Sequence, residues 1–534
     1  MRLGIDIGGT FTDLVAVDGD GAVRVTKVRT TPDDPARGLW QAVTALGPDG
    51  PDGAVSLVHG TTVATNALLE RRGGRVALLT TAGFEDLLWL RRQDRAALYD
   101  LARDHPAPLV AREAVIGVVE RVGATGVVVP LSDAEVTRAV QAAVRLAPEA
   151  VCISLLFSFA HPDHERRLAE ALRRALPRCP VVASHEVLPL FREYERTSTA
   201  TVEAYLRPLV GRYLARIGEE AARHGVGDFR VMASNGGTLS AEQAGVRAAS
   251  LALSGPVGGV EGARLVAAQT GERDLLTLDM GGTSADASVV LGGEPLVQSA
   301  GAVGGIPLAL PHVLIETVGA GGGSIAWVDG GGALRVGPRS AGAVPGPACY
   351  GLGGEDATVT DAALVLGWLD PAHPLAADLV LDPGLARGAV ERLGRRAGLT
   401  TEACAEGIIA IATATMVRAL RGVSVERGVD PRGMTLVAFG GAGPLFVCRL
   451  ADSLGVPRAV IPPHAGALSA LGLATARARV EFAASLHRRT DGLDPRTLAA
   501  AFEPLERAAL AELPEATVSR VAECRYPGQG YEVA

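Results

Sequence analysis

The stretch Leu3-Gly4-Ile5-Asp6-Ile7-Gly8-Gly9-Thr10-Phe11-Thr12-Asp13 is an apolar run that ends in an acid and a glycine turn. This pattern predicts a strand that leads into a hairpin. Glycines let backbone N–H groups approach an anion closely, threonine hydroxyls add donors, and an acid at the strand end can hold a hydrated cation. The stretch therefore predicts a phosphate-binding hairpin, with Asp6, Gly8, Gly9, Thr10 and Thr12 as candidate ligand-binding residues.

The same pattern returns later in the chain, in Leu276-Thr277-Leu278-Asp279-Met280-Gly281-Gly282-Thr283-Ser284-Ala285-Asp286. Both copies have a strand, an acid, an apolar residue, Gly-Gly-Thr, two further residues and a second acid. The recurrence strengthens a signal that would be weak alone. The candidate binding residues of the second hairpin are Asp279, Gly281, Gly282, Thr283 and Ser284.

Length and composition indicate a large α/β protein. A chain of 534 residues is too long for one core and suggests three or four units. Its 66 glycines and few aromatics suit glycine-turned parallel sheets with helical cover. The net charge of −8 is mild and spread along the chain, so we expect neither a nucleic-acid nor a membrane partner. Lys27 is the only lysine, so backbone, hydroxyls and metal must hold the phosphates.

The cysteines and the apolar runs bear on location. The six cysteines are scattered without a C-x-x-C pair, which argues against zinc ribbons and disulfide frameworks. No charged and apolar leader precedes the first strand, and the longest apolar run, 407–417, is too short to span a bilayer. We therefore expect a cytoplasmic protein.

Two further glycine-rich segments are candidate parts of the site. In Leu436-Val437-Ala438-Phe439-Gly440-Gly441-Ala442-Gly443-Pro444 a third strand-to-glycine turn opens a helix, which suits the adenosine or the phosphates of a nucleotide. Residues 316–354 are rich in glycine and include Gly321 and Gly322. Either the backbone approaches a ligand there, or the turns are tightly packed.

His59 ends a predicted strand and is followed by Gly60-Thr61-Thr62. In one interpretation a threonine caps the next helix. In the other, His59 and the threonines lie at the carboxyl end of the strand, where α/β sheets bind ligands. The spacing alone leaves the two even.

The chain resembles a known family along nearly its whole length. Two acid-and-glycine hairpins followed by a late glycine turn resemble the superfold of acetate kinase, heat-shock chaperones and actin. Within it, the motifs resemble the hydantoinase A/5-oxoprolinase family and occur in the same order. These motifs are residues 6–13, 59–62, 191–196, 254–256, 279–284, 319–324, 345–351 and 439–445.

The resemblance implies a fold and a domain organisation. The fold is α/β, a two-domain actin-like (ribonuclease H-like) ATPase fold with a truncated C-terminal segment. Residues 1–185 would form the N-terminal domain with the first hairpin, 186–485 the hydantoinase A domain with the second hairpin and the adenosine motif, and 486–534 the start of an incomplete C-terminal domain.

The resemblance also implies an activity. Family members use ATP to open a cyclic amide or, in the carboxylase branch, to carboxylate a ketone, together with a hydantoinase B-type subunit in a hetero-oligomer. ATP would phosphorylate the amide oxygen and turn it into a leaving group. Asp6 and Asp279 would hold Mg²⁺, mostly through water. Asp13, Asp286 and His59 are the catalytic candidates, although the two acids have an equal interpretation as turn carboxylates bonded to nearby N–H groups.

Two other functions share parts of the pattern. Many sugar kinases open with Asp-Ile-Gly-Gly-Thr, but Phe11-Thr12-Asp13 stands where such kinases usually carry lysine, and no cysteine cluster could form their zinc site. An actin-like or chaperone-like scaffold would also bind ATP. Nothing in the chain suggests a peptide-binding domain or a filament surface.

The last residues resemble the start of a further domain. The pattern predicts a helix over 498–513 that Pro504 kinks or divides, a strand over 517–524, and a turn at 527–530 into a strand cut off at Val533. An unpaired strand edge invites fraying or association. We therefore expect the segment beyond Asp491 to be poorly anchored.

Overall fold

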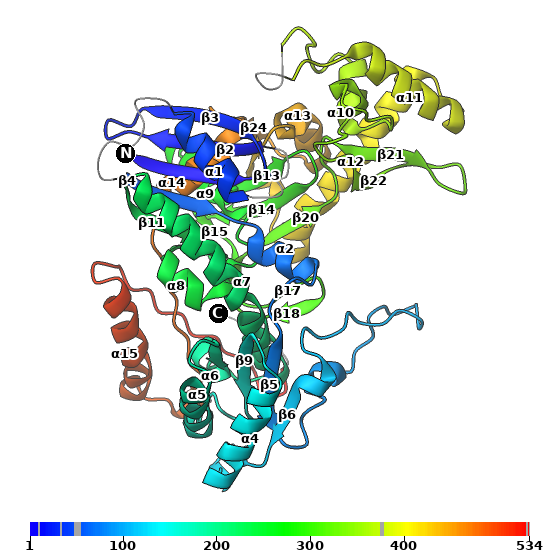
Figure 1. Cartoon of the computed structure of the whole chain (residues 1–534). Helices are drawn as coiled ribbons and strands as arrows, with labels where there is room; N and C mark the ends of the chain where they lie inside the picture. Colours follow the sequence, from blue (N-terminus) through cyan, green and yellow to red (C-terminus); the bar gives the residue numbers. More distant parts are fainter. Residues whose placement is uncertain are drawn as a thin grey trace. The chain divides into compact units, whose positions relative to one another are not determined.

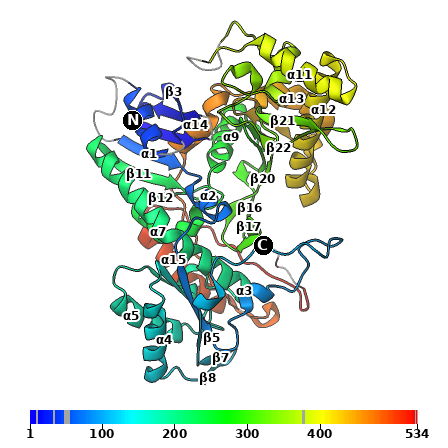
Figure 2. The ribbon, with the colours of Figure 1, turned by 45° about the vertical axis from the view of Figure 1, so that its right-hand side comes forward.

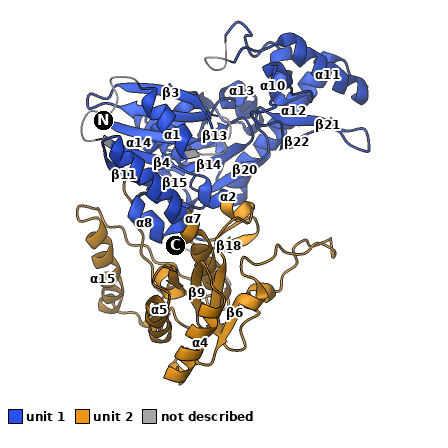
Figure 3. Cartoon of the chain, viewed as in Figure 1, with its two compact units in different colours: residues 1–66, 210–299, 311–477 blue, residues 67–209, 300–310, 478–534 orange. Residues whose placement is uncertain are grey.

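The computed structural model describes residues 1–8, 11–31, 35–46, 55–373, 379–486, 488–529 and 532 (Figure 1). The chain folds into two compact units, which Figure 3 shows in different colours. Unit 1 contains residues 1–66, 210–299 and 311–477, and unit 2 contains 67–209, 300–310 and 478–534. Both hairpins belong to unit 1. The predicted domain boundaries after residues 185 and 485 stay a prediction.

The first sheet of unit 1 has the order β12-β11-β4-β1-β2-β3. β1, β2 and β3 are antiparallel neighbours, whereas β4 runs parallel to β1 and β11 runs parallel to β4. Figure 1 shows blue β4 beside green β11, although the two are far apart in sequence. The strands are β1 (Arg2–Ile7), β2 (Phe11–Val17), β3 (Val23–Arg29), β4 (Val55–Gly60), β11 (Val226–Met232) and β12 (Thr238–Ser240).

The second sheet of unit 1 repeats this connectivity. β13 pairs antiparallel with β14 and parallel with β23, β23 is parallel to β24, and β20 pairs antiparallel with β14 as β3 does with β2. The strands are β13 (Leu275–Met280), β14 (Ala285–Leu291), β15 (Glu294–Pro295), β20 (Ile315–Val318), β23 (Thr435–Phe439) and β24 (Arg458–Val460). Two sheets with one connectivity confirm the predicted ribonuclease H-like, actin-like fold.

Helices cover both faces of the first sheet. On one face, α1 (Pro35–Thr44) and the end of α7 (Glu193–Arg223) bury Leu3, Ile5 and Leu14. On the other face, α14 (Leu468–Thr475) contacts β1 and packs on α9 (Val257–Thr270), as Figure 2 shows. The approach of these two helices requires glycine, because a Cβ atom at Gly472 would lie 1.9 Å from the carbonyl oxygen of Gly258.

The long helix α12 (Thr401–Val423) covers one face of the second sheet. The stretch Thr401–Arg427 is long and apolar enough to cross a membrane, but 56% of its most apolar window is buried inside the protein. It packs against β14 and β20, as a core helix does. It contacts α10 (Val359–Val365), α11 (Pro383–Ala397), α13 (Gly443–Leu454) and β22 (Leu334–Ser340), and β22 pairs with β21 (Ser324–Val328).

Unit 2 contains a parallel sheet of order β10-β9-β5-β6 with short elements around it. Its buried polar core is centred on Glu165, whose carboxylate accepts hydrogen bonds from the Leu155 N–H (2.8 Å) and the Ser184 hydroxyl (2.7 Å). The strands are β5 (Val76–Thr81), β6 (Val115–Val118), β7 (Arg121–Gly123), β8 (Gly126–Val129), β9 (Ala150–Ser154), β10 (Val181–Ala183), β17 (Gly301–Val303) and β18 (Ile306–Leu308). The helices are α3 (Leu87–Leu90), α4 (Asp133–Arg145), α5 (Asp163–Ala175) and α6 (Ser184–Val187). Short elements elsewhere are α2 (Val63–Leu69), α8 (Ala241–Val246), β16 (Val297–Gln298) and β19 (His312–Val313).

In the C-terminal segment, Pro504 does not divide the predicted helix, and one predicted strand is wrong. α15 (Pro495–Glu512) is one helix that continues through Pro504, and none of its side chains is buried. Water can satisfy the backbone carbonyl that proline leaves unpaired on an exposed helix. The predicted strand over 517–524 is wrong, because the segment is exposed and forms only a bridge position at Cys524. Val533 lies outside the described residues.

Candidate functional site

The two glycine turns close in the same way. The N–H of Gly8 donates to the carbonyl of Phe11 over 3.0 Å, and the N–H of Gly281 donates to the carbonyl of Ser284 over 3.0 Å. Gly282 and Thr283 lie exposed at the tip of the second turn. The corresponding Gly9 and Thr10 lie outside the described residues. The repeated sequence thus produces a repeated backbone geometry.

Each hairpin carries a pair of facing acids. Asp6 lies opposite Asp13 in the β1–β2 register, and Asp279 lies opposite Asp286 in the β13–β14 register. Opposite residues of neighbouring strands point to the same face. The two acids that flank each glycine turn therefore form a pair of neighbouring carboxylates, and the two hairpins carry equivalent pairs.

Neighbouring side chains hold three of the four acids. The ammonium of Lys27 lies 2.5 Å from Oδ1 of Asp13. The hydroxyl of Ser469, at the start of α14, donates to Oδ2 of Asp279 over 3.0 Å. The hydroxyl of Thr317 donates to Oδ1 of Asp286 over 2.5 Å.

The four acids form one electrostatic cluster. Burial, reinforced by the charges of Asp13, Asp279 and Asp286, raises the pKa of Asp6 to about 8. Burial raises the pKa of Asp286 to about 7 and that of Asp279 to about 6, although the Ser469 hydroxyl lowers the latter. Burial also raises the pKa of Asp13, against the charge of Lys27. Concentrated carboxylates of this kind favour either protons or a bound cation.

The donor set suits a hard cation, because it consists of carboxylate and hydroxyl oxygens. Among the residues that the structure describes, no group of three His, Cys, Asp or Glu side chains converges to hold a metal ion by itself. A cation bound here would therefore complete its shell with water or with oxygens of a ligand. Mg²⁺ usually binds in this way, with several water ligands and only one or two carboxylates.

The glycine-rich loop around Gly321 supports the second hairpin. The N–H groups of Gly322 and Gly323 donate to the carbonyls of Gly281 (3.0 Å) and Gly282 (2.7 Å). A Cβ atom at Gly321 would lie 2.5 Å from the backbone nitrogen of Thr283. Gly321 and Gly322 are buried and hold the turn in place, and direct contact with a nucleotide stays a prediction for them.

The third glycine turn follows β23 and lies beside Asp279. Gly440 has a φ of +79°, and a Cβ atom there would lie 2.2 Å from Oδ1 of Asp279. The N–H of Ala442 donates to the carbonyl of Met280 over 2.9 Å, and α13 begins at Gly443. Gly441 is exposed, with nothing within 4 Å of a Cβ atom. This open backbone beside the cluster could accept a ligand.

Two predicted site residues face away from the acids. His59 pairs with Ile5 in the β1–β4 register, so its ring lies on the opposite sheet face from Asp6. It is fully buried, and its Nε2 lies 2.8 Å from the hydroxyl of Tyr213. Burial lowers the pKa of His59 to about 4. The geometry favours a neutral core histidine.

Thr12 is also fully buried on that face. Its hydroxyl lies 3.2 Å from the hydroxyl of Thr30, which in turn donates to the carbonyl of Gly8 over 2.8 Å. Thr12 therefore supports the first turn from behind, and phosphate contact by its hydroxyl stays a prediction. Sequence reasoning did not find Thr30, Thr317 or Ser469 as partners, because their contacts depend on register and on helix packing.

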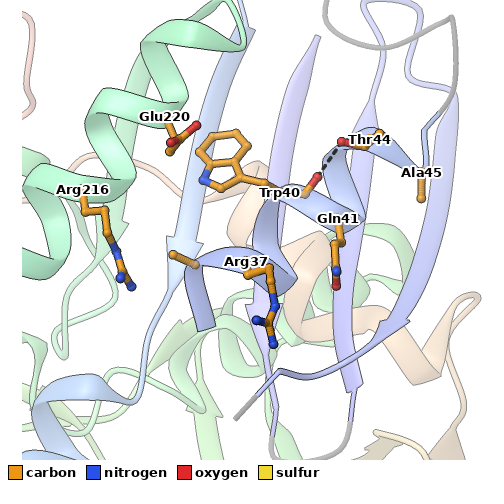
Figure 4. A pocket seen from close by; sticks show the side chains of 8 residues that line it. Arg37, Trp40, Gln41, Thr44, Ala45, Arg216 and Glu220 are labelled. Carbon is orange, nitrogen blue, oxygen red and sulfur yellow. Dashed lines mark hydrogen bonds between the residues drawn. The ribbon is translucent and has the colours of Figure 1, made fainter. Parts of the chain in front are cut away.

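A separate pocket lies between α1 and α7, on the sheet face away from the acids. Figure 4 shows the indole of Trp40 pointing from α1 toward α7, with Arg37, Arg216 and Glu220 around it. The ring of His224 stacks on the indole at 4.7 Å. The pocket contains none of the predicted site residues.

The comparisons with known proteins agree with the geometry. The model of the hydantoinase/oxoprolinase N-terminal region matches residues 2–176, and the hydantoinase/oxoprolinase model matches residues 196–482. The caprolactamase alpha subunit of Pseudomonas jessenii is 38% identical over 92% of this chain and 72% of its own. The acetophenone carboxylase gamma subunit of Aromatoleum aromaticum is 36% identical over 88% of this chain and 67% of its own. The chain covers only 41% of 5-oxoprolinase 1 of Arabidopsis thaliana, at 34% identity over 89% of this chain.

Two solved structures are similar over the whole chain. The ATP-dependent caprolactamase from Pseudomonas jessenii has a TM-score of 0.87 and 36% identity, covering 100% of this chain and 80% of that chain. A nucleotide-free acetone carboxylase, described in terms of ATP-dependent acetone carboxylation, has a TM-score of 0.79 and 29% identity, covering 100% of this chain and 81% of that chain. Together with the matched motifs and the duplicated hairpins, these findings show that the chain belongs to the hydantoinase/oxoprolinase family.

Proposed function

We propose that the protein is an ATP-dependent subunit that opens cyclic amides through a phosphorylated carbonyl. The observation that carries the proposal is the pair of equivalent hairpins, whose facing acids form one electrostatic cluster. The glycine turns suit phosphate groups, and the carboxylates suit a cation that would accompany them. The similarity to an ATP-dependent caprolactamase supports the cyclic amide as substrate class.

The proposal includes Mg²⁺. The raised pKa values of Asp6 and Asp279 indicate carboxylates that a cation would neutralise, and their oxygens suit that metal. Asp6 and Asp279 would hold it, mostly through water. When bound, Mg²⁺ would neutralise the charge of the ATP phosphates.

The chain's own groups would orient ATP and stabilise charge on its terminal phosphate. Backbone N–H groups of the two turns are the donors available to the phosphoryl oxygens. The amide oxygen bonds to the γ-phosphorus while the bond from that phosphorus to the β-phosphate oxygen breaks, releasing ADP. Water then adds to the activated carbon, and the ring C–N bond breaks to leave a free amine and an acyl phosphate. A second water attacks the acyl carbon, phosphate leaves with the former amide oxygen, and the product is the open-chain amino acid. Asp13 and Asp286 would position the reacting groups, and His59 has no part in this scheme.

Partner and location belong to the same proposal. The relatives are named as alpha and gamma subunits, which supports a hetero-oligomer, and we propose a hydantoinase B-type subunit as the partner. All six cysteines are free thiols, which supports a reducing cytoplasm.

A ketone carboxylase is the second candidate. The acetophenone carboxylase relative and the acetone carboxylase structure favour it specifically. Membership of the hydantoinase/oxoprolinase family disfavours the sugar kinase and the scaffold.

ADP release separates the two candidates. The protein is assayed with a B-type subunit and ATP, with hydantoin, 5-oxoproline or caprolactam in one series and ketone plus bicarbonate in the other. We expect a cyclic amide to stimulate ADP release and to be opened. ADP release that ignores every cyclic amide but follows ketone plus bicarbonate would overturn the proposal in favour of the carboxylase.

A further inference from the structure

The single lysine of the chain lies beside the first hairpin. Lys27 is the only lysine among 51 basic residues, so arginine serves at all the other basic positions. Arginine and lysine differ in shape. A guanidinium is a planar fork that engages both oxygens of a carboxylate, whereas an ammonium is a compact point charge. In a chain that otherwise uses arginine, position 27 therefore points to a requirement that a guanidinium does not meet.

The contacts of Lys27 define that requirement. Lys27 lies on β3, directly opposite Asp13 in the register, and its ammonium lies 2.5 Å from Oδ1 of Asp13. The same ammonium lies 5.0 Å from the ring centre of Phe11. The Lys27 side chain is one third exposed, so it can meet a ligand from solvent.

Lys27 also has a unique electrostatic position. Among the described residues, it is the only basic side chain that forms an ion pair with any of Asp6, Asp13, Asp279 and Asp286. A cluster of carboxylates repels the phosphates of a nucleotide. A single ammonium at its edge offsets part of that repulsion without occupying the second oxygen of Asp13.

We propose that Lys27 is a positioning residue of the nucleotide site, which fixes the carboxylate of Asp13 opposite Asp6 and places a positive charge next to the bound phosphates. This inference rests on the proposed function, because it presumes that the hairpins bind ATP. It predicts that arginine at position 27 would engage both oxygens of Asp13 and serve poorly.

The uniqueness of Lys27 supplies a readout that does not depend on activity. Reductive methylation with ¹³C-formaldehyde labels amines and keeps their charge, so the protein should give one lysine methyl signal beside that of the N-terminal amine. Calorimetry first establishes that Mg²⁺ and a non-hydrolysable ATP analogue bind. We then expect the analogue to shift the lysine signal. Binding that leaves this signal unmoved would overturn the inference, whereas absence of binding would instead overturn the proposed function.

Kinetic measurements on variants test whether Lys27 acts by positioning the carboxylate of Asp13. Lys27→Met should lower kcat by at least about tenfold, with a smaller change in the KM for ATP, as expected for a group needed in the transition state. Lys27→Arg should recover only part of this loss. In an Asp13→Asn background, Lys27→Met should add little further loss, because both changes break one pair. Full additivity, or full activity of Lys27→Arg, would contradict a positioning role through Asp13.

Arg24 provides the matched control. It lies on the same strand and forms an ion pair with Asp18 at 3.3 Å, with both side chains about one third exposed. Arg24→Met should leave kcat and the lysine signal unchanged. Thermal melting checks that each variant folds. If Lys27→Met does not fold, the labelling experiment on the wild-type protein still tests whether Lys27 lies next to the bound nucleotide.

Discussion

Asp279 is the residue whose charge matters most to the proposed metal site. It is the penultimate residue of β13, faces Asp286, and accepts a hydrogen bond from Ser469. Asp279→Asn keeps the shape and the hydrogen-bond acceptor but removes the charge that a cation needs. We expect ATP turnover to fall by about 10²-fold or more. The melting temperature at neutral pH should be at least that of the wild type, because burial disfavours the ionised carboxylate that the variant lacks. A steady-state ADP assay measures the loss, and wild-type turnover in a folded variant would show that Asp279 does not serve the site.

For His59 we expect a loss of stability and no loss of turnover. Its fully buried ring fills the core between β4 and α7 and meets Tyr213. We expect His59→Ala to lower the free energy of unfolding by about 2–4 kcal/mol, through a cavity and the loss of the hydrogen bond between His59 and Tyr213. Urea unfolding measures this. Turnover per folded molecule should stay near wild type, and a specific loss of lactam dependence in a stable variant would restore His59 to the site.

At the scale of elements, neighbouring glycines of the third turn should behave differently. Gly440→Ala would combine a φ of +79° with a Cβ atom 2.2 Å from Asp279, so Asp279 must shift. We expect a loss of about 1–3 kcal/mol in stability together with loss of ATP turnover. The matched variant Gly441→Ala meets no atom within 4 Å and should fold normally. Melting and turnover are measured for both.

Gly441→Ala then reports on the ligand. If the backbone at Gly441 approaches a nucleotide, the added methyl group should weaken ATP binding while the melting temperature stays the same. If Gly440→Ala and Gly441→Ala destabilise the protein equally and strongly, the turn tolerates no side chain at either position. The close approach of Gly440 to Asp279 would then not be the cause of the loss of stability in Gly440→Ala.

The sequence predicted the hairpins well because they are local. Glycine turns, strand-end acids and their spacing determine Asp6, Asp13, Asp279 and Asp286 within a few residues of chain. The register then places the two acids of each hairpin opposite one another. The sheet face on which the side chains of His59 and Thr12 lie was not predictable from the sequence of one strand, because it depends on which helices pack on each face of the sheet. The strand predicted over 517–524 was wrong, because the pattern of a strand does not supply its partner.

Contacts across the fold were beyond sequence reasoning. Ser469 reaches Asp279 only because glycines let α14 approach α9 closely. Thr317 reaches Asp286 through the register of β20 with β14. In both cases the two partners are separated by a long stretch of chain, and tertiary packing alone joins them.

At the scale of the whole molecule, the acidic cluster predicts how stability depends on pH. Unfolded aspartates lose their protons near pH 4, whereas Asp279, Asp286 and Asp6 keep them to about 6, 7 and 8 in the metal-free fold. Between pH 4 and 8 the native state thus holds more protons, so the free energy of unfolding should fall as pH rises. Urea unfolding without divalent metal measures it.

The same cluster predicts how Mg²⁺ acts. The cation competes with protons, so it should raise the melting temperature more at pH 8 than at pH 5. The Asp279→Asn variant should lose part of that increment. An increment that is equal at both pH values would contradict a carboxylate site for the metal.

The central claim is that two equivalent hairpins form one nucleotide site, and calorimetry of nucleotide binding tests it most directly. A non-hydrolysable ATP analogue is titrated into the wild-type protein with Mg²⁺, then with a chelator, and then into Asp279→Asn with Mg²⁺. The account predicts one nucleotide per chain, with binding at least about tenfold weaker after removal of either the metal or the carboxylate. Equally tight binding in all three titrations, or none in the first, would contradict it.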